Sequence, residues 1–164
     1  MKLGIFTLAG VLACLPGAAF SAEKTLTLGL SDALSGGGAV YGLAQKRAID
    51  LAIEQINAAG GIAVGEDTYK LATIEYDDKA DPTEATNVAR KLIDRDGVKY
   101  LIGYCCSASA GAVASIMGRE DAIMLVGTAG ARAITAAGYD NIFASARWHV
   151  CVPWLRRPCG MAGR

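Results

Sequence analysis

From residue 22 to residue 146, short apolar runs typical of strands alternate with longer stretches in which apolar residues have helical spacing. Short apolar runs bounded by polar or glycine-rich segments favour strands, and apolar residues at i, i+3, i+4 and i+7 favour helices. The pattern predicts strands at residues 25–30, 69–76, 99–103, 122–126 and 141–145. It predicts helices between them, at residues 41–58, 81–96, 107–118 and 131–137.

The first two predicted helices have clear boundaries. The first has a predicted buried stripe of Ile49, Ala52, Ile53 and Ile56. Gly60-Gly61 should end it, because glycine tolerates the positive φ common after a helix. Asp81-Pro82-Thr83-Glu84 is a strong start for the second helix. Asp81 can cap it, Pro82 suits the first helical position, and Glu84 can reach back to the cap.

Strands alternating with helices predict an α/β domain, a doubly wound parallel sheet covered on both faces. We expect the strand order second, first, third, fourth, fifth, which places a ligand crevice at the carboxyl ends of the strands. The loops at that edge are residues 31–41, 104–109 and 127–131, which are rich in small residues. The second of these loops leads into a helix N-terminus, which attracts phosphate or carboxylate groups.

The first 21 residues have the pattern of a secretory signal peptide. Lys2 is followed by an apolar run to residue 15, too short to span a bilayer, and then by Ala19-Phe20-Ser21 with small residues at the cleavage positions. We expect cleavage after Ser21, with Ala22 as the alternative, and a periplasmic location. A second hypothesis is a lipoprotein, because Val11-Leu12-Ala13-Cys14 resembles a weak lipid-attachment sequence that would tether the chain at Cys14.

Charge and composition separate the last 18 residues from the rest of the chain. Residues 22–146 contain eleven bases and sixteen acids, a net charge of −5, which argues against nucleic-acid binding. Residues 147–164 contain no acid, both tryptophans and the only histidine. This segment is either a basic interaction tail or, as we favour, the aberrant product of a reading-frame slip.

The motifs that suggest catalysis or cofactors are incomplete. Ser107 or Cys106 would need an activating base, but the only histidine lies in the aberrant segment. The glycines of the first loop have the spacing G-x-G-x-x-x-G, one residue longer than a dinucleotide fingerprint. The adjacent Cys105 and Cys106 are an awkward pair for one metal ion. We therefore expect no catalytic residue, cofactor or metal, and interpret Asp77-Asp78 as a solvated strand end.

Four stretches carry a resemblance to a known family: "LSGGGAVYG", "RAIDLAIEQINAAGGI", "IEYDDKADPTEATNVARKLIDRDGVKYLIGYCCSASA" and "IMLVGTAGARAITAAGYDNIFAS". In order and spacing they resemble the N-terminal lobe of the substrate-binding proteins of branched-chain amino acid ABC importers, over about residues 25–145. The resemblance implies one lobe of a type I periplasmic-binding-protein fold, which closes with a second lobe on an amino acid. It implies an inner-membrane ABC permease as partner and no enzyme activity.

The resemblance also implies which residues contact the ligand. Ser107, Thr128 and Gly130 match the positions that hold its α-carboxylate, and Tyr41 matches a tyrosine that packs near it. Two positions depart from the family pattern. The family often has a hydroxyl residue where this chain has Gly130. Ala80 stands where the family often has a cysteine that pairs with the equivalent of Cys106. The resemblance favours leucine, isoleucine and valine as ligands. Other amino acids, amides and small carboxylates are the alternatives. Cys105 has no expected role beyond packing.

The chain of 164 residues is less than half as long as such proteins usually are. The resemblance therefore implies a truncated product without the second lobe, which binds ligand weakly or not at all and exposes an apolar face between the lobes. Two other functions remain open. One is the ligand-sensing domain of a receptor with the same fold, and the other is a secreted α/β enzyme that uses Ser107 or Cys106.

Overall fold

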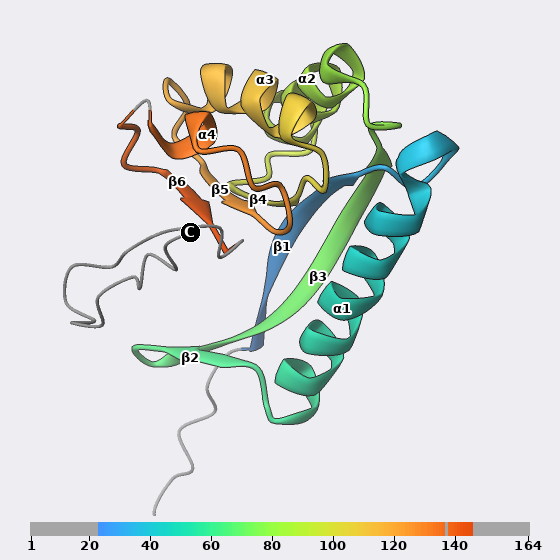
Figure 1. The fold of residues 1–164 in the computed structure, drawn as a ribbon. Helices are drawn as coiled ribbons and strands as arrows, with labels where there is room; N and C mark the ends of the chain where they lie inside the picture. The colour runs from blue at the N-terminus through green and yellow to red at the C-terminus, as the bar shows by residue number, and fades with distance from the viewer. Residues whose placement is uncertain (1–22, 137, 146–164) are drawn as a thin grey trace, which may run out of the picture.

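The computed structural model describes residues 23–136 and 138–145. They form a six-stranded sheet in the order β2-β3-β1-β4-β5-β6, with helices against both faces (Figure 1). The strands are β1 (Glu23–Asp32), β2 (Ile62–Val64), β3 (Asp67–Asp77), β4 (Tyr100–Gly103), β5 (Ile123–Val126) and β6 (Ile142–Ala144). The predicted signal segment, and the predicted aberrant segment from residue 147 onward, lie outside the described residues.

The order predicted for the five strands found in the sequence pattern is confirmed, and these strands are β1, β3, β4, β5 and β6. β1 lies between β3 and β4, and all pairs from β3 to β6 are parallel. The pattern missed β2, which pairs antiparallel with the start of β3 as a hairpin at the sheet edge. β2 has only three residues and all of them are exposed, so its apolar run is too short to predict a strand.

The helices are α1 (Ala39–Ala58), α2 (Pro82–Arg90), α3 (Ser107–Met117) and α4 (Ala133–Ala136). A 3₁₀ turn at Gly36–Gly38 precedes α1, and a π-helical segment, Lys91–Arg95, continues α2. Figure 1 shows α1 on one side of the sheet and α2, α3 and α4 on the other. The predicted helix at residues 81–96 is thus one continuous helical stretch whose last turn is wider than an α-helix.

The start of α2 confirms Asp81 as its cap. Oδ1 of Asp81 accepts hydrogen bonds from the backbone N–H groups of Thr83 at 2.8 Å and Glu84 at 2.9 Å. The N–H of Asp81 donates to the carbonyl of Asp78 at 2.8 Å. The expected return contact from Glu84 is therefore wrong, because the Asp78 carbonyl accepts from this N–H instead.

The main core lies between the sheet and the helices α2, α3 and α4. Leu101 and Met124 point into it from neighbouring strands, and both are fully buried with Leu92, Val113 and Met117. Alternate residues of a strand point to opposite faces, so the next residue on each strand faces away from this core. The side of the sheet that carries α1 is formed by those other residues.

Half of that second face is open among the described residues, so the prediction of full cover on both faces is wrong there. α1 packs mainly on β1 and β3 and also contacts β4, whereas Ile102, Leu125 and Phe143 form a row across β4, β5 and β6. Leu125 is 44% exposed and Phe143 is 52% exposed. The predicted buried stripe of α1 is correspondingly incomplete: Ile49, Ile53 and Ile56 are half-buried, and Ala52 is exposed.

Candidate functional site

The carboxyl ends of β1, β4 and β5 bring three loops to one edge of the sheet, as the predicted order requires. Backbone hydrogen bonds fix their positions: the N–H of Tyr104 donates to the carbonyl of Ser31 at 2.8 Å, and that of Gly127 donates to the carbonyl of Gly103 at 2.8 Å. A longer bond of 3.3 Å runs from the N–H of Ala129 to the carbonyl of Tyr104. This edge carries all four residues that the sequence predicts for the ligand site.

Ser107 is exposed and is the first residue of α3. Cys106 caps the helix through its backbone only, and its carbonyl accepts the first helical bond from the N–H of Ala110 at 2.9 Å. The N–H groups of the first turn have no helical partner and give this end a partial positive charge. Oγ of Ser107 accepts a 3.3 Å hydrogen bond from the N–H of Ala131, beside the exposed Gly130. The arrangement suits a small anion.

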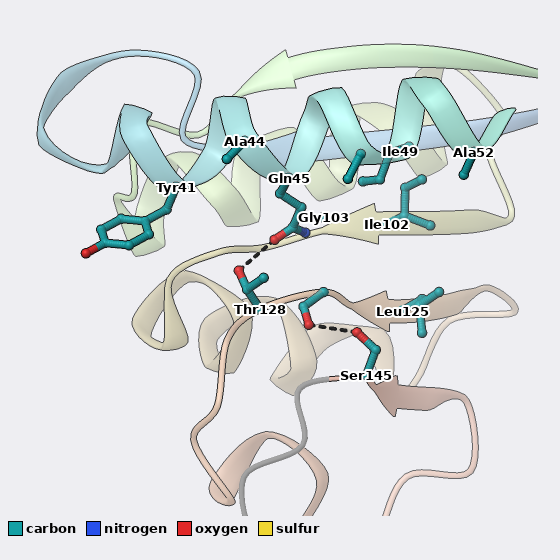
Figure 2. Close-up of a pocket in the computed structure, with 12 residues that line it drawn as sticks. Tyr41, Ala44, Gln45, Ile49, Ala52, Ile102, Gly103, Leu125, Thr128 and Ser145 are labelled. Atoms are coloured by element: carbon teal, nitrogen blue, oxygen red, sulfur yellow. Dashed lines mark hydrogen bonds between the residues drawn. The ribbon is translucent and has the colours of Figure 1, made fainter. Parts of the chain in front are cut away.

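Thr128 and Tyr41 lie in a neighbouring part of the same edge, a cleft of about 540 Å³ between α1 and the strands β4 and β5. Figure 2 shows Gln45 reaching from α1 toward Thr128, whose hydroxyl donates to Oε1 of Gln45 at 2.7 Å. Tyr41 is 68% exposed, and its ring extends outward beside the start of α1 (Figure 2). The structure thus joins Ser107 to the segment that follows Gly130, and places Thr128 and Tyr41 at the cleft.

Sequence reasoning missed Gln45, although a signal was present. Gln45 is four residues before Ile49 and therefore extends the apolar stripe of α1 by one turn. A polar residue on a buried stripe needs partners in the fold. Gln45 is only 8% exposed, and its Nε2 has no hydrogen-bond partner among the described residues.

Asp32 and Asp78 are buried where β1 and β3 end. Oδ1 of Asp32 accepts from the N–H groups of Ala33 and Cys105, both at 3.0 Å, while Oδ2 has no partner among the described residues. Oδ2 of Asp78 accepts from the hydroxyl of Ser31 at 3.1 Å, and Oδ1 accepts from the N–H of Ala80 at 2.9 Å. Burial raises the pKa of Asp78, and the nearby carboxylates of Asp32 and Asp77 raise it further, against the lowering by these two hydrogen bonds.

Asp77 organises the first loop. Its carboxylate accepts from the hydroxyl of Ser35 and from the N–H groups of Leu34 at 2.8 Å, Ser35 at 3.3 Å and Lys79 at 2.9 Å. Burial alone would raise the pKa of Asp77, but these hydrogen bonds outweigh it and the pKa is lowered. The interpretation of Asp77-Asp78 as a solvated strand end is wrong, because Asp77 bonds the loop after β1 and Asp78 is buried and bonds Ser31 of β1.

Neither a metal centre nor a membrane helix is found in the part of the chain that the structure describes. No group of three or more His, Cys, Asp or Glu side chains there could hold a metal ion. No helix there has both the length and the apolar character needed to cross a bilayer. The edge at the carboxyl ends of the strands offers the hydroxyl of Ser107 and the N-terminus of α3.

Comparison with known proteins places this fold. The family described as periplasmic binding protein matches residues 25–149, most of the chain. The chain belongs to the periplasmic binding protein family. Curated relatives include the leucine-, isoleucine-, valine-, threonine- and alanine-binding protein of Pseudomonas aeruginosa, 36% identical over 147 residues. Another is the Leu/Ile/Val-binding protein of Escherichia coli K12, 39% identical over 110 residues.

The match covers most of this chain but a minor part of each relative. It covers 87% of this chain and 38% of the Pseudomonas protein, and 67% of this chain and 29% of the Escherichia protein. The chain therefore corresponds to about a third of the length of these periplasmic binding proteins. The relatives are named for binding amino acids, and none of these names describes an enzyme.

Solved structures agree with this assignment. LivJ from Streptococcus pneumoniae, a branched-chain amino acid transporter substrate-binding protein in complex with isoleucine, superposes with a TM-score of 0.67 at 28% identity. The superposition covers 74% of this chain and 33% of LivJ. An ABC transporter solute-binding protein from Rhodopseudomonas palustris, in complex with 3,4-dihydroxybenzoic acid, has a TM-score of 0.63 at 28% identity, over 73% of this chain and 31% of its own.

Proposed function

We propose that this chain forms part of the ligand site of an extracytoplasmic solute-binding protein that delivers branched-chain or related amino acids to an ABC importer. One observation carries the proposal: Ser107 is exposed at the N-terminus of α3 and is bonded to Ala131 in the loop after β5. A hydroxyl group next to unpaired helix N–H groups is suited to an amino-acid carboxylate.

The ligands named for similar proteins fit this chemistry. Isoleucine and 3,4-dihydroxybenzoic acid, which are named for two structural neighbours, both carry a carboxylate. Ser107 and the first turn of α3 would hold that group, with Thr128 and Gly130 from the loop after β5. Tyr41 would pack near the rest of the ligand. The preference for leucine, isoleucine or valine rests on the curated relatives.

The proposed activity requires export. Residues 1–21 would direct the chain to the periplasm, residues 22–146 would form the ligand-binding lobe, and residues 147–164 would be an aberrant tail. The N-terminus of the exported protein tests this division. Edman or mass analysis should find Ala22 first, whereas a lipid-modified Cys14 would support the lipoprotein hypothesis. DNA sequencing across the codons for residues 140–164 tests the reading-frame slip. An inner-membrane ABC permease is the proposed partner.

A ligand titration followed by amide NMR tests the site itself. The relatives are much longer than this chain, so we expect it to supply only part of the contacts and to bind leucine weakly, with a dissociation constant of about 1 mM or higher. Leucine should shift the amide signals of residues 107–109 and 128–131. Leucinamide, which lacks the carboxylate, should not.

Two serines of α3 provide matched variants. Ser107→Ala should reduce the leucine-induced shifts at residues 107–109 severalfold, because it removes one donor to the carboxylate. Ser115→Ala, at the other end of the helix, is also exposed and its hydroxyl only bonds the Ala112 carbonyl, so it should leave the shifts unchanged. Absence of shifts at the solubility limit of leucine, or equal responses to leucine and leucinamide, would contradict the proposed site.

A further inference from the structure

Two neighbouring thiols lie immediately before the proposed carboxylate site. Cys105 and Cys106 join the end of β4 to the start of α3, and both are free and half-buried. Their sulfur atoms are 3.5 Å apart. Because a disulfide bond is about 2.05 Å long, the two sulfur atoms would have to approach each other by about 1.5 Å to form one.

Cys105 and Cys106 are the free cysteines of the described residues, so within that part of the chain each can form a disulfide with the other. Ala80 Cβ and Cys106 Sγ lie 3.1 Å and 3.7 Å from the point that a Cβ on Gly38 would occupy. Both atoms therefore border the same space at Gly38, and residue 80, in the loop after β3, is an alanine with no sulfur to pair with Cys106. Cys14, Cys151 and Cys159 lie outside the described residues.

The backbone holds this pair in place from both sides. The N–H of Cys105 donates to Oδ1 of Asp32 at 3.0 Å, and the preceding Tyr104 has a φ of 62°. On the other side, the carbonyl of Cys106 accepts the first helical bond of α3 from Ala110. The two thiols are thus presented together by a fixed strand-to-helix connection.

We propose that Cys105 and Cys106 form a reversible vicinal disulfide by thiol–disulfide exchange with a low-molecular-weight disulfide. The thiolate of one cysteine attacks a sulfur of the small disulfide, which breaks its S–S bond and releases one small thiolate. The thiolate of the other cysteine then attacks the mixed disulfide, forms the Cys105–Cys106 bond and releases the second small thiolate. The two protons of the cysteines pass to the two released thiolates, so two cysteine thiols are oxidised and one small disulfide is reduced.

The environment of Cys105 sets the order of these steps. Burial raises the pKa of the Cys105 thiol, and the Asp32 carboxylate raises it further. The thiolate is the attacking species, so Cys106 should attack the small disulfide first and Cys105 should resolve the mixed disulfide.

The bond should be easy to reduce. Consecutive Cα atoms are about 3.8 Å apart across a trans peptide, whereas bridged cysteines usually have Cα atoms at least about 4.4 Å apart. Strained disulfides are the labile and regulatory ones. A vicinal bond here would therefore act as a switch rather than as a structural crosslink.

The switch would act on the proposed ligand site, and this step rests on the proposed function. Cys106 is the N-cap of α3 and Ser107 is its first residue. Closure of the bond would change the cap conformation next to the carboxylate-binding groups. We expect the oxidised chain to bind leucine several-fold more weakly than the reduced chain.

Peptide mapping tests the disulfide independently of any ligand. The folded 164-residue protein is incubated with oxidised glutathione, quenched with acid, alkylated and digested with trypsin. Cleavage after Lys99 and Arg119 gives one peptide, residues 100–119, that holds both cysteines and no others. We expect this peptide to be lighter than its reduced form by two hydrogen atoms, unalkylated, and restored by dithiothreitol.

The single variants Cys105→Ser and Cys106→Ser are the matched controls. Cys105→Ser lacks the resolving thiol and should therefore accumulate a stable glutathione adduct on residues 100–119. Cys106→Ser lacks the attacking thiol and should react many-fold more slowly. Full alkylation of the wild-type peptide, a stable glutathione adduct on it, or a crosslink to a peptide containing Cys14, Cys151 or Cys159 would each overturn the proposal.

Leucine titration of the oxidised and reduced chains separates the two proposals. A vicinal disulfide without leucine binding in either state would refute the proposed function alone. Leucine binding without the disulfide would refute the switch alone. If the disulfide forms but leucine binds both states with equal affinity, the Cys105–Cys106 bond does not affect the ligand site, and the proposed switch is refuted.

Discussion

The amide end of Gln45 lies directly on Gly127. A Cβ on Gly127 would be 2.1 Å from Nε2 of Gln45, and Oε1 of the same side chain accepts the hydroxyl of Thr128. This contact connects α1 to the loop after β5, two segments that are 83 residues apart in the sequence. The φ of Gly127 is not in the left-handed region, so its backbone conformation does not require glycine. The short distance to Gln45 does, because a larger side chain has no space there.

Gly127→Ala should destabilise the fold by about 1 kcal/mol, since Gln45 must swing aside and lose its hydrogen bond to Thr128. In a Gln45→Ala background the same substitution should cost only a few tenths of a kcal/mol, because the obstructing amide is gone. A double-mutant cycle measured by urea unfolding gives this coupling. Additive costs in the cycle would show that Gln45 is not the cause.

Asp81→Ala should lower the free energy of unfolding by about 1 kcal/mol, because it removes the acceptor for the N–H groups of Thr83 and Glu84 at the start of α2. Asp81→Asn keeps a side-chain oxygen at the cap and should cost much less. Urea unfolding of the two variants at pH 7 provides the comparison. Equal losses in both would mean that the negative charge, and not the hydrogen bonds, stabilises this end.

The burial of Asp78 should make the fold less stable as the pH rises. Its pKa is raised in the folded chain, so the folded state holds the proton more tightly than the unfolded state. This stabilisation is complete below the unfolded pKa, about 3.9 for aspartate, and is lost as the pH rises through the folded pKa. The side chain of Asp78→Asn does not titrate, so the unfolding free energy of this variant should not fall over that pH range. At a pH above the folded pKa of Asp78, it should exceed the unfolding free energy of the wild type.

Asp77→Asn is the control with the opposite sign. The pKa of Asp77 is lowered, so its contribution is present above the unfolded pKa and is lost as the pH falls through the folded pKa. Urea unfolding at a series of acidic pH values measures this. The free energy of unfolding should fall less at low pH in Asp77→Asn than in the wild type. If Asp78→Asn and the wild type have parallel pH profiles, the carboxyl group of Asp78 does not retain its proton in the folded chain.

The open row of Ile102, Leu125 and Phe143 should cause self-association of the 164-residue chain. Leu125→Lys places a charge in the centre of this row, between its neighbours on β4 and β6. We expect the dissociation constant for self-association to rise by about tenfold or more, which corresponds to about 1.4 kcal/mol of lost apolar burial and added charge desolvation. Sedimentation velocity over a concentration series measures it.

Val64→Lys is the matched control for this surface. Val64 is 58% exposed and lies on β2, at the opposite edge of the sheet from β6. It should leave the self-association unchanged. A wild-type chain that stays monomeric at high concentration would contradict the prediction outright.

Local patterns in the sequence were sufficient for five of the six strands and the order of those five, and missed only the short edge strand β2. The apolar runs marked the strands, and Asp81-Pro82 marked the start of α2. The alternation of strands and helices limits a parallel sheet to few topologies, because right-handed crossovers and short connections exclude most others. Ser107 was placed at a helix N-terminus from the same patterns, and the structure finds it there.

The environment of buried polar groups was decided only by the tertiary structure. Asp32 bonds Cys105 across 73 residues, and Thr128 bonds Gln45 across 83. A periodic pattern reports which face of one element is apolar, but not which distant loop will cover a polar side chain on it. For the same reason the sequence predicted a sheet covered on both faces, while only the packing of α1, mainly over β1 and β3, decided which part of the second face is covered.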